Sequence, residues 1–157
     1  RPTIAQVSGS DFISNPDLHH EVFGPFSLLI ECIDKNELTQ VVQVIKGQLT
    51  GSVFSTDQEL LEHEQLINTL KNRVGRIIYN GVPTGVEVCD SMQHGGPYPA
   101  TTDPRFTAVG PDAIKRFARP LSFQNWPQHL LPDELKDANP LAIQRIVDGK
   151  VQTADRS

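Results

Sequence analysis

The sequence predicts an α/β fold in which a mostly parallel sheet carries flanking helices. Strand patterns and amphipathic helix patterns alternate through the first half of the 157 residues, and this alternation is typical of parallel strands joined by helical crossovers. Beyond Asn80 neither period continues, and nine of the twelve prolines lie in that part of the chain. We therefore expect a long ordered loop followed by an irregular, proline-rich C-terminal tail.

Four short runs of apolar and β-branched residues predict the strands, at residues 3–7, 26–33, 50–55 and 74–79. The run at 26–33 is apolar on both of its faces. A strand of that kind belongs inside a sheet, where both faces are covered.

Two amphipathic helices are predicted between these strands. Asp34 is a suitable N-cap for the first, whose apolar positions recur at helical spacing until Gly47 ends the pattern. Thr56 and Asp57 begin the second helix in the same way. A further short helix is expected at 111–117, where a proline stands at its first position.

The C-terminal part is predicted to contain one strand and two short segments. The strand is expected at 121–125, and prolines separate the segments 133–138 and 141–147. We expect residues 1–125 to form one domain and residues 126–157 to be a C-terminal extension that packs on it.

Composition limits the classes of partner. The chain is 38% apolar and 21% charged with a formal charge of −5, which is typical of a globular protein and lacks the basic footprint of nucleic-acid binding. No apolar run reaches the ~20 residues of a membrane helix, and the first residues do not resemble a secretory signal. We therefore expect a soluble, cytoplasmic protein, with Cys32 and Cys89 as reduced thiols.

The most specific motif is Glu-Val-Phe-Gly-Pro at residues 21–25. By itself it is also compatible with a simple Gly-Pro turn before a strand. Two further blocks follow it, Leu-Thr-Gly-Ser-Val-Phe at 49–54 and Gly-Arg-Ile-Ile-Tyr-Asn at 75–80. In this order and at approximately this spacing, the three blocks resemble the aldehyde dehydrogenase superfamily.

Later blocks extend the resemblance over nearly the whole chain. They include Pro-Thr-Gly-Val-Glu-Val at 83–88 and the run from His94 to Asp103, and they continue at 116–120, 130–132 and 137–140. They resemble the subgroup that oxidises α-ketoglutarate semialdehyde, also called 2,5-dioxovalerate, or fatty aldehydes. The resemblance implies that the chain is the C-terminal portion of the catalytic domain of an oxidoreductase that turns an aldehyde into a carboxylic acid.

The resemblance implies that residues 21–25 contact a nicotinamide cofactor, NADP or alternatively NAD. The Glu21 carboxylate is suited to accept hydrogen bonds from both ribose hydroxyls, and Phe23 supplies an apolar wall beside the nicotinamide. Gly24 lets the backbone approach, and Pro25 holds φ where the chain enters the next strand. No cofactor is expected to bind this chain by itself, because the other cofactor-binding elements of the family precede Arg1.

The resemblance also implies that the catalytic residues are absent from this chain. The family's nucleophilic cysteine and general-base glutamate lie upstream of Arg1, and a first residue other than methionine agrees with part of a longer protein. The chain alone is therefore predicted to be inactive. Its expected contribution to binding the small aldehyde substrate is a loop that contains Asn80, Thr84, Val86, Cys89, His94 and Arg105.

Several residues have alternative interpretations. Cys89 and His94 are close enough in sequence to form the nucleophile and base of a small thiol hydrolase. The five histidines match no zinc spacing, so no metal site is expected. Arg105 is the best candidate to bind a substrate carboxylate, although pairing with Asp103 is the usual alternative.

A different class of function also remains open, namely a non-catalytic assembly module. In the family a late strand pairs across subunits, and residues 121–125 occupy the corresponding place. An unpaired strand edge there favours self-association, and we expect a homo-oligomer.

Overall fold

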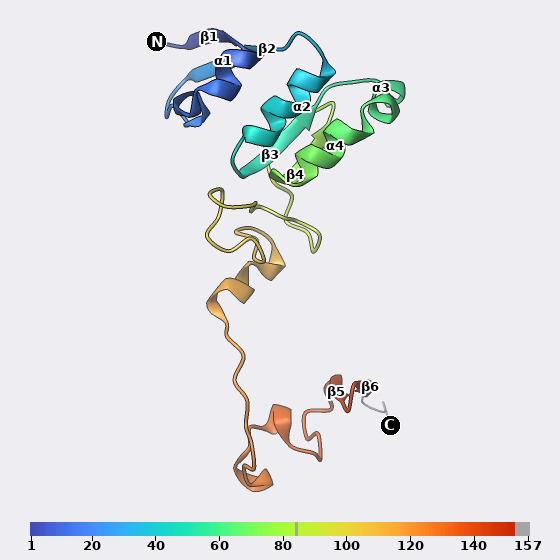
Figure 1. The fold of residues 1–157 in the computed structure, drawn as a ribbon. Coiled ribbons are helices and arrows are strands. Elements are labelled where there is room, and N and C mark those ends of the chain that lie inside the picture. The colour runs from blue at the N-terminus through green and yellow to red at the C-terminus, as the bar shows by residue number, and fades with distance from the viewer. Residues whose placement is uncertain (84, 153–157) are drawn as a thin grey trace. The chain divides into compact units, whose positions relative to one another are not determined.

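The computed structural model describes residues 1–83 and 85–152. Contacts divide the chain into two compact units, the first being Arg1–Ala118 and the second beginning at Arg119 (Figure 1). The domain boundary expected after residue 125 stays a prediction. No helix in the described ranges has the length and apolar character needed to span a membrane.

The first unit contains the four expected strands, and both of its strand pairs are parallel. β1 (Thr3–Ser8) pairs with β2 (Phe26–Glu31), and β3 (Gln48–Val53) pairs with β4 (Val74–Tyr79). The parallel α/β architecture is therefore confirmed. The strands nevertheless form two separate two-stranded sheets, where the sequence predicted a single one.

β2 is less buried than the sequence predicted. Its residues alternate between partly buried and exposed, and Leu29 is 55% exposed. β1 is its single neighbour within the described chain. The expectation of two covered faces is wrong for this chain, because no helical layer within the described residues covers the exposed face.

The helix after β2 forms where the capping pattern placed it. α2 (Lys35–Val44) begins after Asp34, whose Oδ1 accepts hydrogen bonds from the amides of Asn36 and Glu37, both at 2.8 Å. Before β2, the short helix α1 (Gly9–Ser14) and the 3₁₀ helix Pro16–His19 were not predicted. Their few residues do not establish a helical period.

The second predicted helix is interrupted. It consists of α3 (Asp57–Glu62) and α4 (Glu64–Lys71), and His63 between them has non-helical dihedral angles of φ −115° and ψ 29°. Thr56 and Glu59 form a capping box at its start, in which the Thr56 amide donates to Glu59 Oε2 at 2.7 Å. The expected start is therefore confirmed.

The core of the first unit is small. Helices α2 and α4 contact each other and lie beside the β3–β4 pair (Figure 1), where Val41 is 3% and Val74 is 8% exposed. Phe12 of α1 is the other buried apolar residue in the described chain. Many large apolar side chains therefore remain uncovered.

After β4 the chain passes against the sheet that it has just left. A Cβ built on Gly75 would lie 1.7 Å from the carbonyl oxygen of Gly95, and one on Gly47 would lie 1.9 Å from that of Pro97. A Cβ on Gly96 would lie 2.3 Å from the oxygen of Gln48. Glycine is required at these positions because backbone meets backbone with no space for a side chain. We call residues 95–98 the strap.

The second unit contains two 3₁₀ turns, Gln128–Leu130 and Asp133–Leu135, and a hairpin. β5 (Arg145–Val147) pairs antiparallel with β6 (Lys150–Gln152) across Asp148 and Gly149, whose φ values are 51° and 74°. Asp-Gly with positive φ at both positions is a favoured hairpin turn. The expectation of an irregular, proline-rich tail is therefore not confirmed, and the local signal for the hairpin is the Asp-Gly pair.

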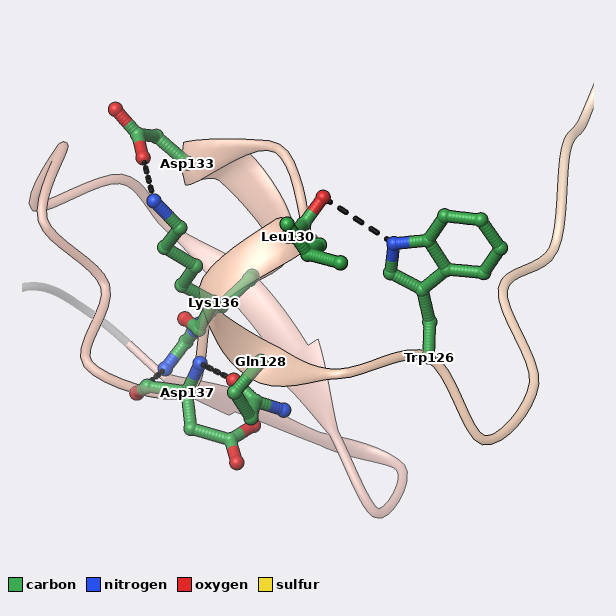
Figure 2. A network of polar contacts seen from close by, with 7 residues as sticks. Trp126, Gln128, Leu130, Asp133, Lys136 and Asp137 are labelled. Atoms are coloured by element: carbon green, nitrogen blue, oxygen red, sulfur yellow. Dashed lines mark hydrogen bonds and ion pairs between the residues drawn. The ribbon is translucent and has the colours of Figure 1, made fainter.

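Polar contacts stabilise the second unit (Figure 2). The Trp126 indole donates to the Leu130 carbonyl at 3.2 Å, and the Lys136 ammonium lies 2.6 Å from the Asp133 carboxylate. None of the described residues from Arg119 onward is buried. Polar contacts thus hold this unit together in the absence of buried residues among those described.

The expected strand at 121–125 is not formed among the described residues, where this segment has no ladder partner. A strand that pairs across subunits has no partner within one chain. Its role in assembly stays a prediction.

We predict that Gly75→Ala destabilises the first unit strongly, because the new methyl group overlaps the Gly95 backbone. The expected loss of unfolding free energy is about 1–3 kcal/mol or more, measured by urea denaturation. Gly85→Ala is the matched control, since a Cβ at Gly85 has no atom within 4 Å. Equal losses for both variants would contradict the close approach.

Candidate functional site

Residues 21–25 connect the 3₁₀ helix Pro16–His19 with β2. Gly24 has φ 144°, a conformation that strains residues with a side chain. The Phe26 amide donates to the Gly24 carbonyl at 2.8 Å, and the Thr3 amide donates to the Pro25 carbonyl at 2.9 Å. The motif is therefore a tight turn attached to the start of β1.

The acidic and aromatic residues of this turn face open space. Phe23 is 96% exposed, which is unusual for a phenylalanine, and Glu21 is also exposed. Glu21 lines two adjacent hollows of about 510 and 580 Å³. Residues of β1 and β2 line the first, and residues 46–50 together with Pro99 and Ala100 line the second. An exposed carboxylate beside an exposed aromatic ring is suited to a polar ligand with a flat ring.

Asn80 connects the ends of β3 and β4. Its Oδ1 accepts from the Ser55 amide at 2.9 Å, and its Nδ2 donates to the Ser55 carbonyl at 2.8 Å. Its own amide donates to the Val53 carbonyl at 2.8 Å. With φ 46°, Asn80 also turns the chain out of β4 into the loop. All of its side-chain hydrogen bonds go to backbone, so it organises the start of the loop.

The expected substrate-loop residues after Asn80 have different environments. Thr84 lies outside the described residues, and Val86 is 40% exposed. The His94 amide donates to Thr107 Oγ1 at 2.8 Å, and the Ala108 amide donates to the His94 carbonyl at 2.9 Å. Thr107 is itself buried, so the His94 backbone is held from within the loop.

The two cysteines are free thiols in different settings. The Cys89 sulfur lies 3.4 Å from Ser91 Oγ, and no hydrogen bond joins it to His94, although both residues belong to the described part. Nothing here favours the thiol-hydrolase alternative. Burial raises the pKa of the Cys32 thiol, and the carboxylates of Glu37 and Asp34 raise it further. A raised pKa makes Cys32 a poor nucleophile.

Arg105 forms a two-pronged ion pair with Asp103. Nε donates to Oδ1 at 2.9 Å and Nη2 donates to Oδ2 at 2.6 Å, while the arginine side chain stays 79% exposed. Hydrogen bonds from Arg105 lower the pKa of Asp103 to about 2. The pair is the usual surface arrangement, and a role for Arg105 in binding a substrate carboxylate stays a prediction.

The histidines show no metal site. No group of three or more potential ligands is present in residues 1–83 and 85–152. His19 instead makes a hydrogen bond, with Nε2 lying 2.7 Å from the Phe12 carbonyl oxygen.

Two curated bacterial proteins are similar to nearly the whole chain. The protein named alpha-ketoglutaric semialdehyde dehydrogenase 2 of Azospirillum brasilense is 45% identical over 147 residues, or 94% of this chain. The alpha-ketoglutaric semialdehyde dehydrogenase of Acinetobacter baylyi is 48% identical over 150 residues, or 95%. The chain belongs to the aldehyde dehydrogenase superfamily. It spans 28% of the length of each relative, and no family model matches the sequence.

Within this aldehyde dehydrogenase chain, the expected site residues belong to two segments. The first segment is the exposed turn, which contains Glu21, Phe23 and Gly24. The second is the loop that follows β4, which contains Asn80, Cys89 and His94. Both relatives are named as enzymes, and they give no support to the assembly-module alternative.

Sequence reasoning missed Arg76, which lies in β4 and shares a hollow with His94. The sequence feature that could have identified Arg76 is a charged residue inside a short apolar strand. It also missed the need for glycine at positions 47 and 75, for which a single sequence offers no local signal.

We predict that Asn80→Gly lowers the unfolding free energy of this aldehyde dehydrogenase chain by about 1–3 kcal/mol. Glycine keeps the positive φ but removes both side-chain bonds to Ser55. Asn125→Gly is the control, since Asn125 has φ 56° and no side-chain hydrogen bond in the described structure. Urea denaturation measures both, and an Asn80→Gly variant as stable as the control would contradict the connecting role.

We predict that the Asp103 carboxylate titrates near pH 2 and that Arg105→Gln returns its pKa towards the ordinary value of about 3.9. Because the folded pKa is lowered, the stabilisation from the pair is present above pH 4 and is lost as the pH falls towards 2. Carboxyl ¹³C NMR titration measures the pKa. Lys115→Gln is the control and should leave Asp103 unchanged, whereas an unshifted Asp103 in the parent chain would refute the pairing.

Proposed function

We propose that the chain is the C-terminal portion of the catalytic domain of an aldehyde dehydrogenase that oxidises α-ketoglutaric semialdehyde to the dicarboxylate with NADP. The observation that carries the proposal is identity of 45–48% over 94–95% of the chain with two relatives that bear this name. The shared name favours the semialdehyde acid over a fatty aldehyde as substrate.

The turn at residues 21–25 fits a nicotinamide cofactor. Glu21 is exposed on two hollows, and a Cβ at Gly24 has no atom within 4 Å, so the backbone is open to a ligand. The Glu21 carboxylate would accept hydrogen bonds from the ribose hydroxyls, and Phe23 would cover one side of the nicotinamide. When bound, the oxidised nicotinamide supplies the hydride acceptor.

The remaining contribution of this chain is to shape the substrate side. Asn80 holds the point where the loop leaves β4, and the strap holds the segment after His94 against the sheet. In this proposal the nucleophile and the general base lie outside these 157 residues. The 157 residues alone are therefore inactive in this proposal.

We also propose that the intact protein is a cytoplasmic homo-oligomer. Large apolar side chains of the second unit, such as Leu121 at 65% and Ile146 at 72%, are exposed. Burying them against another surface would stabilise that unit, which has no buried residue among those described.

The test is an assay of the intact protein that contains this chain, with α-ketoglutaric semialdehyde and NADP. Glu21→Gln is expected to raise KM for the cofactor about 10- to 100-fold, because a charge-assisted hydrogen bond contributes about 1.5–3 kcal/mol. Glu64→Gln is the control, since it removes the same charge from the exposed start of α4.

Two outcomes contradict different parts of the proposal. Failure of the intact protein to reduce NADP or NAD with any aldehyde refutes the activity. Normal activity with an unchanged cofactor KM in Glu21→Gln refutes the ribose contact alone. Turnover by the isolated 157 residues would show that the catalytic groups lie within them.

A further inference from the structure

A hollow of about 370 Å³ lies between β3, β4 and the loop that follows β4. Leu49 and Thr50 of β3 line it, together with Arg76 of β4 and Val86 and His94 of the loop. The lining therefore combines basic and polar side chains with aliphatic ones. It shares Leu49 and Thr50 with the larger of the two hollows beside Glu21.

Arg76 lacks a counter-ion in this hollow. Its side chain is partly buried, and its Nε is buried without a hydrogen-bond partner. Nη1 has only long contacts, at 3.4 Å to the Gly85 carbonyl and 4.0 Å to the Met92 sulfur. Among the described residues no carboxylate forms an ion pair with it. Partial burial of an unpaired charge is unfavourable until an anion approaches.

His94 also lines this hollow and has an unused polar atom in its side chain. Its Nδ1 is buried and has no partner in the described structure. The bonds of its backbone to Thr107 and Ala108 hold the residue in place, and the strap follows directly after it. In the tautomer protonated at Nδ1, the ring has a free donor for a ligand oxygen.

We propose that Arg76 and His94 bind the carboxylate of a short aliphatic oxo acid. A guanidinium is suited to a carboxylate because its planar N–H groups match the two oxygens. Leu49 and Val86 accommodate the methylene groups of such a ligand, and Thr50 offers a hydroxyl. This inference rests on the proposed function in that the ligand is the acid end of the semialdehyde substrate, so the two residues determine substrate specificity.

The first test measures binding without turnover. α-Ketoglutarate is titrated into the intact protein by isothermal calorimetry, and Arg76→Gln is expected to weaken its binding about 10- to 100-fold. Arg76→Lys should retain part of the affinity, and His94→Leu should lower it by a smaller factor. Lys115→Gln is the control, because it removes one exposed surface charge that is paired with Asp112.

A second measurement separates the site from a structural role. If the intact protein oxidises aldehydes, Arg76→Gln should raise KM for α-ketoglutaric semialdehyde about 10- to 100-fold. For uncharged pentanal, both kcat and KM should stay unchanged. An equal rise for both aldehydes overturns the proposal, as does unchanged α-ketoglutarate binding in both Arg76→Gln and His94→Leu. Inorganic phosphate that competes as well as α-ketoglutarate overturns the assignment to a carboxylate.

These outcomes are distinguishable from failure of the proposed function. If the intact protein oxidises no aldehyde, calorimetry with α-ketoglutarate still decides whether Arg76 and His94 bind a carboxylate. If Arg76→Gln does not fold, judged by circular dichroism, Arg76→Lys and His94→Leu decide the matter.

Discussion

The close backbone approach of the strap to β3 and β4 is the constraint on which the rest of the first unit depends. Gly75 lies against Gly95, and Gly47 lies against Pro97, at separations that exclude any side chain. Because these contacts join main chain to main chain, they leave little freedom for the segment between them. They therefore determine where His94 and the loop before it lie relative to the sheet.

Strand β4 connects this constraint with the chemistry. Within its short length Gly75 receives the strap, Arg76 faces a hollow without a counter-ion, and Asn80 directly after it fastens the end of β3. A change in the register of β4 would displace all three together, because successive side chains alternate between its faces. The loop is thus organised by one strand, although the sequence marks the loop itself as irregular.

Uncovered apolar surface is a second general feature of this chain. Leu29 of β2, Phe23 of the turn and Ile146 of the hairpin are all largely exposed, and only three apolar residues are buried in the described part of the chain. The chain spans 28% of its relatives' length, and the proposed function makes it part of a longer protein. We expect such surfaces to be covered in the intact protein, where they would contribute to its stability.

Local patterns in the sequence were enough for the strands β1 to β4, the Asp34 cap and the start of α3, because periodicity and capping depend on neighbouring residues. The Asp148-Gly149 hairpin also has a local signal, because Asp-Gly favours a tight turn between two strands. The family, too, was evident from ordered motifs alone. Tertiary structure decided which distant residues come together: Gly47 and Gly75 contact the strap, Asn80 bonds to Ser55, and Arg76 and His94 line one hollow. These long-range contacts depend on how the chain folds back against its own sheet. Local sequence patterns do not determine that path.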